Sequence, residues 1–229
     1  MLPASLLDGH ARFRAGRLAA ERERWHRLVQ EGQRPEVMVV ACCDSRVAPE
    51  LIFDARPGEL FVVRNVANLV PPWGPGGTHH GTSAALEFGV SVLGVRHVVV
   101  MGHARCGGIA AALRGAGSVD GGDHIAHWLS LIDGTIAACG CGSRDGAVDA
   151  RRLERSSIVA SIANLRSHPM LAQREAAGLV AFHGLWFDIS DGALFAWDEA
   201  SAAWRSATGF SATAAQAPCA ISTSMPPER

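Results

Sequence analysis

The sequence lacks several features that would place it in a common class of protein. No stretch approaches the roughly 20 consecutive apolar residues that a membrane-spanning helix needs, and the N-terminus has no long apolar core after a basic start. The formal net charge is −1, from 21 basic and 22 acidic residues, and no arginine stripe with interleaved aromatic residues is present. We therefore expect a soluble, cytoplasmic protein with no membrane and no nucleic-acid partner.

Lysine and tyrosine are absent altogether. We interpret the use of arginine at every basic position as coding bias rather than function. Six cysteines are present, and in a reducing compartment they favour thiols or metal ligands over a disulfide framework. Cys139-Gly-Cys141 offers a second metal site in principle, but an isolated pair in a glycine-rich turn is weak evidence for one.

The 229 residues, 48% of them hydrophobic, are enough for one α/β domain with a large core. Short apolar runs at 37–41, 60–63, 97–101 and 179–187 predict strands covered on both faces, and the last run offers a turn at Gly184 into a further strand. Helical patterns at 82–93, 109–114, 124–138 and 149–166 lie between them. This alternation predicts an α/β fold with a central, mostly parallel β-sheet of four strands plus a fifth edge strand, flanked by helices.

The two ends of the chain differ from this pattern. Residues 11–31 predict a charged amphipathic helix, which makes residues 1–34 an N-terminal helical arm. Residues 210–229 are rich in small and polar residues and predict a mobile tail. The single domain then covers residues 1–209.

Two clusters of reactive side chains follow predicted strands directly. Cys42-Cys43-Asp44-Ser45-Arg46 follows the first strand, and His103-Ala104-Arg105-Cys106-Gly107-Gly108 follows the third. Sites in open α/β sheets form at the carboxyl ends of strands, and thiolates with imidazole suit zinc. Taken alone, each motif is explained as readily by a chance match or by buried structural cysteines as by a metal site. Their joint placement favours a metal site with three protein ligands and a free fourth position, which is typical of catalytic zinc.

These motifs resemble those of the β-class carbonic anhydrases. That family has Cys-x-Asp-Ser-Arg followed some sixty residues later by His-x-x-Cys-Gly-Gly, and this chain has both in order. The stretch 61–68 (FVVRNVAN) and the later Phe182-His183-Gly184 are also similar to the family. The resemblance is dense from about Gln33 to Leu113 and looser to about Asp198.

The resemblance implies an enzyme that hydrates carbon dioxide reversibly to bicarbonate and a proton, by attack of zinc-bound hydroxide. It implies one Zn²⁺ per chain on Cys42, His103 and Cys106, with Asp44 and Arg46 as the catalytic polar dyad. Asp44 would accept a hydrogen bond from the zinc-bound water. The implied substrate site consists of Gln33, Phe61, Val66, Phe88 and the backbone N–H of Gly107. From the residues alone, Phe61, Val66 and Phe88 fit a core better, and the two glycines also fit a simple turn before a helix.

Three departures from the family pattern stand out. Cys43 replaces the usual serine, and alternation along the chain points it away from Cys42. Phe88 replaces a tyrosine of many relatives, which removes one hydroxyl from the pocket. Val39 replaces the tryptophan of a regulated subgroup in which the dyad aspartate binds zinc, so we expect the open form with water on the metal. His79 and His80 are candidate proton shuttles only because histidine titrates near neutral pH.

The same residues also allow other functions. The same zinc site suits hydrolysis of carbonyl sulfide or carbon disulfide, because fold and ligands do not decide the substrate. A non-catalytic zinc-stabilised interaction module would need a closed site with four ligands. A thiol redox protein using Cys42 and Cys43 is disfavoured, because adjacent cysteines form an awkward disulfide. The resemblance also implies a homodimer or homotetramer in which the N-terminal arm of one chain lies over the neighbouring chain. The arm carries an apolar stripe that would suit this contact or packing on the arm's own domain equally well: Phe13, Leu18, Trp25 and Leu28.

Overall fold

The described residues form a six-stranded sheet in the order β2-β1-β3-β4-β5-β6. The structure is a computed structural model, and it describes residues 1–74, 80–115, 122–141 and 146–207. The strands are β1 (Val37–Cys42), β2 (Leu60–Asn65), β3 (His97–His103), β4 (Ala181–Phe187), β5 (Leu194–Asp198) and β6 (Ala203–Ser206). The first four pair in parallel, and β5 and β6 add antiparallel strands beyond β4. The mostly parallel α/β fold predicted from the sequence is confirmed.

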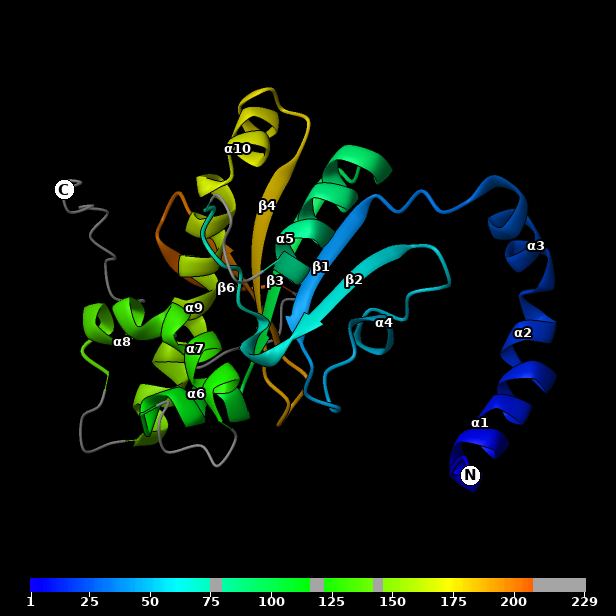
Figure 1. Ribbon diagram of the computed structural model, residues 1–229, viewed down its shortest axis with the longest axis horizontal. Helices are drawn as coiled ribbons and strands as arrows, with labels where there is room; N and C mark the ends of the chain where they lie inside the picture. Colours follow the sequence, from blue (N-terminus) through cyan, green and yellow to red (C-terminus); the bar gives the residue numbers. More distant parts are fainter. Residues whose placement is uncertain (75–79, 116–121, 142–145, 208–229) are drawn as a thin grey trace.

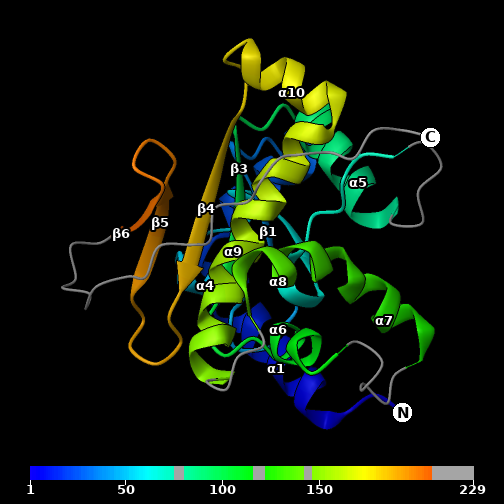
Figure 2. The same ribbon diagram turned by 90° about the vertical axis from the view of Figure 1, so that its left-hand side faces the viewer.

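Helices cover the sheet and its carboxyl edge (Figures 1 and 2). Together, α5 (His80–Glu87), α9 (Gly146–Ser167) and α10 (Pro169–Ala176) lie against one face. At the end where the parallel strands finish lie α6 (Gly107–Leu113), α7 (Asp123–Leu129) and α8 (Asp133–Cys139). The remaining short elements are α4 (Pro49–Ile52), η1 (Val66–Asn68), the π-helix η2 (Phe88–Leu93) and η4 (Ser130–Ile132). None of the helices in the described ranges is long and apolar enough to cross a bilayer.

The sheet has one more strand than the sequence predicted, and the extra strands do not begin at Gly184. Instead β4 continues straight through Gly184, and β5 and β6 follow as a hairpin, so the fifth strand is not the edge. A Cβ at Gly184 would lie 3.0 Å from Ile158 Cγ2 and 3.1 Å from Trp197 Cβ. The glycine therefore permits α9 to pack closely on the strand, and it does not mark a turn.

The N-terminal arm is not the single helix expected at 11–31. It begins earlier and is divided into α1 (Ala4–Ala15), α2 (Arg17–Ala20) and α3 (Arg22–Glu31), with the first break at Gly16. The arm extends away from the body (Figure 1), and none of the three helices has a buried residue. Arg24 anchors α3 by donating to Pro57 O at 2.7 Å and to Glu59 at 3.0 Å. The proposed tail at 210–229 lies outside the described residues.

Candidate metal centre

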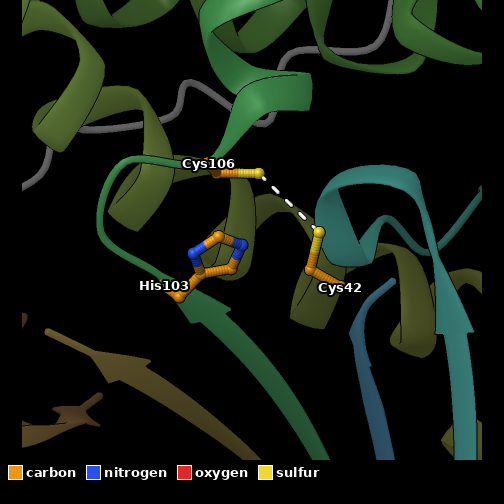
Figure 3. Close-up of side chains that lie close together, drawn as sticks. All are labelled: Cys42, His103 and Cys106. Atoms are coloured by element: carbon orange, nitrogen blue, oxygen red, sulfur yellow. Dashed lines mark hydrogen bonds between the residues drawn. The ribbon is translucent and has the colours of Figure 1, made fainter. Parts of the chain in front are cut away.

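Three soft ligands meet where β1 and β3 end. Cys42 is the last residue of β1, His103 is the last residue of β3, and Cys106 directly precedes α6. All three are buried, and one ligand atom from each lies within 4.8 Å of the others. Figure 3 shows the two sulfur atoms facing each other at 3.9 Å with the imidazole beside them. The parallel pairing of β1 with β3 thus joins two motifs that are far apart in the sequence.

The imidazole is oriented to offer a lone pair to this cluster. His103 Nδ1 lies 2.8 Å from the carbonyl oxygen of Ala104. Because a carbonyl only accepts, Nδ1 carries a proton, and in the neutral ring Nε2 has a free lone pair. Nε2 is buried and has no hydrogen-bond partner among the described residues. Two sulfurs and one unpartnered imidazole nitrogen form a donor set that fits zinc.

The two thiols share a hydrogen bond that shifts their pKa values in opposite directions. Their mutual hydrogen bond lowers the pKa of Cys42 and raises that of Cys106, and burial raises both. A bound dication would deprotonate both thiols, since a coordinating thiol is deprotonated outright.

Asp44 and Arg46 form a bidentate ion pair at the mouth of the cluster. Arg46 Nε donates to Asp44 Oδ1 at 2.9 Å, and Nη2 donates to Oδ2 at 2.6 Å. The Arg46 guanidinium holds the pKa of the Asp44 carboxyl well below its usual range. Asp44 Oδ2 lies 4.0 Å from His103 Nε2. An ionised carboxylate with a fixed orientation therefore borders the ligand set.

Two further side chains brace the ligand loops, and sequence reasoning assigned neither of them a role. Arg64, at the end of β2, donates to Cys42 O at 2.9 Å and to Asp44 O at 2.6 Å. Glu154, on α9, accepts from the backbone N–H of Cys106 at 3.2 Å. Burial raises the pKa of Glu154, and the hydrogen bond from Cys106 opposes that shift. No spacing in the sequence signals these contacts, since both depend on how distant elements pack.

Comparisons with known proteins agree with this geometry. The sequence profile of the family described as "Carbonic anhydrase" matches residues 37–194. A carbonic anhydrase of Pseudomonas aeruginosa is 37% identical over 199 residues, which cover 86% of this chain and 88% of that protein. The chain belongs to the β-class carbonic anhydrases.

Further comparisons support the same family. The chloroplastic β carbonic anhydrase 5 of Arabidopsis thaliana is 33% identical over 79% of this chain, which spans 60% of that protein's length. The structure of the β-carbonic anhydrase CcaA superposes with a TM-score of 0.83 at 26% identity, covering 90% of this chain and 92% of that one. A β-carbonic anhydrase from a study of two tetrameric enzymes of Sordaria macrospora gives 0.71 at 29% identity, covering 84% and 94%. Membership of this family favours an enzyme over a zinc-stabilised interaction module.

A single chain of this β-carbonic anhydrase gathers only part of the expected substrate site. Val66 is half-buried and packs in the same apolar cluster as Cys42 and Cys106. Phe61 lies four residues before Asn65, the strand partner of Cys42, which places it about 13 Å along β2. Its ring contacts the 45% exposed Phe88 at 6.0 Å between centroids. Gln33 is exposed beyond the end of α3.

The structure also places Cys43 and Val39, two of the residues at which the sequence departs from the family pattern. Cys43 is exposed whereas Cys42 is buried, as alternation predicts. Desolvation and the neighbouring Cys42 raise the pKa of Cys43, which disfavours a reactive thiolate there. Val39 is buried on the sheet. His79 and the side chain of His80 lie outside the described part of the chain.

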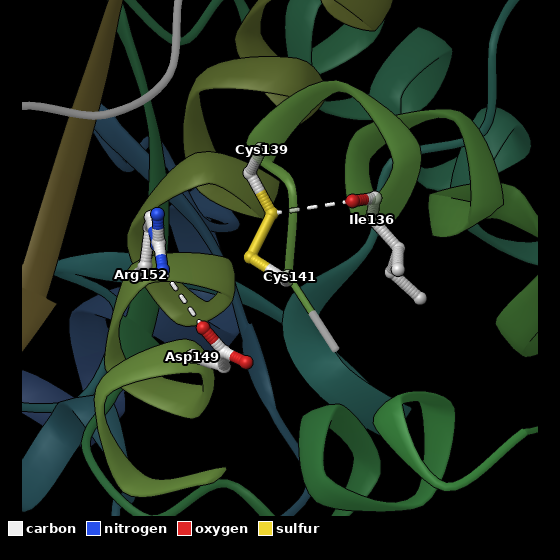
Figure 4. The surroundings of a disulfide bond; sticks show 5 residues. All are labelled: Ile136, Cys139, Cys141, Asp149 and Arg152. Carbon is white, nitrogen blue, oxygen red and sulfur yellow. Dashed lines mark hydrogen bonds and ion pairs between the residues drawn. A yellow bond between two sulfur atoms is a disulfide. The ribbon is translucent and has the colours of Figure 1, made fainter. Parts of the chain in front are cut away.

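The expectation of free thiols is wrong for Cys139 and Cys141, which form a disulfide at the end of α8 (Figure 4). Gly140 between them has a left-handed φ of 61°, and this reversal brings their Cα atoms within 5.3 Å. Nothing of a metal site remains at this pair. An open hollow of about 630 Å³ adjoins Cys141 between α6 and α8, and Cys42, His103 and Cys106 do not line it.

Proposed function

We propose that this chain catalyses the zinc-dependent, reversible hydration of carbon dioxide to bicarbonate and a proton. One observation carries the proposal: Cys42, His103 and Cys106 converge, and the buried Nε2 of His103 has no hydrogen-bond partner in the part of the chain that the structure describes. These three residues would hold one zinc ion. A zinc ion with an open position supplies acidified water at neutral pH, since it lowers the pKa of its bound water to about 7.

The dyad supplies an oriented hydrogen-bond acceptor. Arg46 engages both oxygens of Asp44, so the carboxylate keeps one orientation and remains ionised. In that state Asp44 accepts a hydrogen bond from the reacting water and directs the lone pair of the water towards carbon dioxide. We also propose the open form of the site, in which Asp44 stays on Arg46 and off the metal. A structure with zinc bound at neutral pH and Asp44 as the fourth ligand would contradict it.

The substrate is small and apolar, so its pocket needs apolar walls and few polar groups. Val66 packs against the apolar cluster that includes Cys42 and Cys106. Gly107 begins α6, and backbone N–H groups in a first helical turn have no intrahelical acceptor. The Gly107 N–H can therefore stabilise negative charge that develops on the product. Gln33, Phe61 and Phe88 complete the pocket in this proposal.

A second copy of the chain would bring these remaining residues to the site. The arm exposes Leu6 and Leu7 at the start of α1 by 62% and 53%, and Leu2 just before the helix by 66%, so three large apolar side chains lie close together on its surface. Phe88 is exposed on the body. We propose that the protein forms a homodimer or homotetramer in which chains cover these surfaces for each other. Light scattering on the purified protein tests this proposal.

The decisive experiment is stopped-flow hydration of carbon dioxide on protein of known zinc content, from pH 6.5 to 9. Activity should rise as the bound water ionises, and Asp44→Asn should lower kcat by roughly 100-fold. Asp198→Asn is the matched control, because Asp198 is an arginine-paired carboxylate on β5, away from the ligands. Zinc-loaded protein without hydration activity at any pH would refute the proposed reaction. Folded protein that binds no zinc would refute the site itself.

A further inference from the structure

A buried carboxylate on α9, Glu154, contacts the loop that carries Cys106. Glu154 is only 4% exposed, and both of its oxygens are used. Oε1 accepts from the backbone N–H of Cys106 at 3.2 Å, and Oε2 accepts from Trp186 Nε1 at 3.2 Å. Both donors are N–H groups that cannot accept, so the side chain acts as a double acceptor. Glu154 therefore links a metal ligand on one side to the sheet on the other.

Trp186, the donor on the sheet side of Glu154, is held in one orientation by its neighbours. Trp186 lies in β4 and is 1% exposed. The guanidinium of Arg155 stacks over its ring at 4.2 Å from the centroid and lies 5.0 Å from the ring centroid of Phe195. Stacking of this kind on a buried ring is attractive and fixes the ring plane. The indole N–H consequently points at one position, which Glu154 occupies.

The loop from His103 to Cys106, at the other end of the link through Glu154, has a backbone conformation that surrounding contacts must hold. Between His103 and Cys106 the chain turns through Arg105, whose φ of 56° is uncommon for a residue other than glycine. A turn of this kind persists when surrounding contacts hold it. Three hydrogen bonds from other parts of the chain do so here. Ala104 N–H donates to Phe187 O at 2.9 Å, Arg46 Nη2 donates to Arg105 O at 3.3 Å, and Cys106 N–H donates to Glu154. Of these three, the bond to Glu154 is the one made by a candidate ligand residue.

We infer that Glu154 is a positioning residue of the metal centre, which holds the Cys106 loop so that its thiolate meets Cys42 and His103. The inference rests on the zinc site of the proposed function. Through Trp186 and its contacts, strands β4 and β5 thereby help to set the geometry of the ligands. A purely structural carboxylate would stabilise the packing of α9 without affecting how the metal is held.

Glu154→Gln tests this in the full-length, metal-loaded protein. A glutamine side chain has one carbonyl oxygen that accepts and one NH₂ group that donates. Either the Cys106 N–H or the Trp186 N–H would therefore face the NH₂ group and lose its acceptor. We expect zinc affinity, measured by competition with a chelator, to fall about 10- to 100-fold. In the cobalt-substituted protein the visible ligand-field and thiolate bands should shift. Adding Trp186→Phe removes the conflicting donor, so the double variant should regain part of the lost affinity.

Ser161→Ala is the matched control. Ser161 lies on the same helix and accepts from a backbone N–H, that of Val70, at the same distance of 3.2 Å. This variant should lower the melting temperature while zinc affinity and the cobalt spectrum stay as in the wild type. If Glu154→Gln fails to fold, Trp186→Phe alone carries the test, because freeing one oxygen of Glu154 should still shift the cobalt bands.

The outcomes separate this inference from the proposed function. Wild-type zinc affinity and an unchanged cobalt spectrum in Glu154→Gln would overturn the positioning role, even if the wild type hydrates carbon dioxide. An equal loss of zinc affinity in Ser161→Ala would also overturn it, because the effect would then be general destabilisation. A wild-type protein that binds neither zinc nor cobalt would refute both proposals.

Discussion

Replacing Gly108 with alanine should destabilise the protein, because the added methyl group has no room. A Cβ at this position would lie 2.8 Å from Val66 Cγ1 and 3.0 Å from Ala67 Cβ. Carbon atoms in favourable contact are about 3.5–4.0 Å apart, so the start of α6 and the η1 turn would have to separate by roughly 0.7 Å. Neither side yields easily: Val66 O accepts from Trp128 Nε1 at 2.8 Å, and Ala67 already has a left-handed φ of 63°.

The expected magnitude follows from two opposing effects. Overpacking of a dense interior costs about 1–3 kcal/mol, and alanine is better than glycine in a helix by about 0.5–1 kcal/mol. The net loss is therefore at most about 2.5 kcal/mol and is centred near ~1.3 kcal/mol. For a domain of this size, each kcal/mol shifts the melting temperature by about 2–4 °C, so Gly108→Ala should melt roughly 4 °C lower, and at most about 10 °C lower.

The neighbouring glycine provides the control. A Cβ at Gly107 meets no atom within 4 Å, so Gly107→Ala should keep or slightly raise the melting temperature. Thermal unfolding of both variants, at equal protein concentration and with zinc content assayed, makes the comparison. Equal melting temperatures for the two variants would show that the close approach of α6 to η1 is not maintained in solution.

Arg46→Lys should lower kcat about 10- to 100-fold, because a point charge cannot hold both oxygens of Asp44; stopped-flow assays would check it. The folded-state pKa of Asp44 is depressed, so its stabilising effect is complete above its ordinary pKa of about 3.9 and is lost as the pH falls through the lower folded value. The difference in unfolding free energy between the zinc-free wild type and Asp44→Asn should therefore shrink as the pH falls below about 4. Thermal unfolding at a series of acid pH values measures it, and a difference that does not change with pH would contradict the prediction. Leu153→Ala, at a fully buried position, should cost about 2–5 kcal/mol in urea unfolding. Alkylation without a reductant should leave Cys139 and Cys141 unmodified by mass spectrometry, and labelling of both would exclude the disulfide.

The disagreements between sequence and structure have identifiable causes. An apolar run with a central glycine is compatible with either a bend or a close approach by a helix, and at Gly184 the packing of Ile158 decides for the second. The arm has continuous helical periodicity, yet with no buried residue it has no packing to maintain one straight helix past Gly16. Cysteine spacing alone does not reveal the left-handed turn at Gly140 that brings its neighbours together.

The sequence alone determined the family and the parallel α/β fold, and it predicted the three candidate ligands that the structure brings together. These follow from short-range patterns: apolar runs that must be buried, with Cys42 directly after one and His103 and Cys106 directly after another. Only the tertiary structure decided the bracing of those ligands by Arg64 and Glu154, and the separation of Phe61 and Phe88 from the metal end of the sheet. A side chain on a distant helix or strand leaves no trace in local spacing, because its contact depends on how whole elements pack.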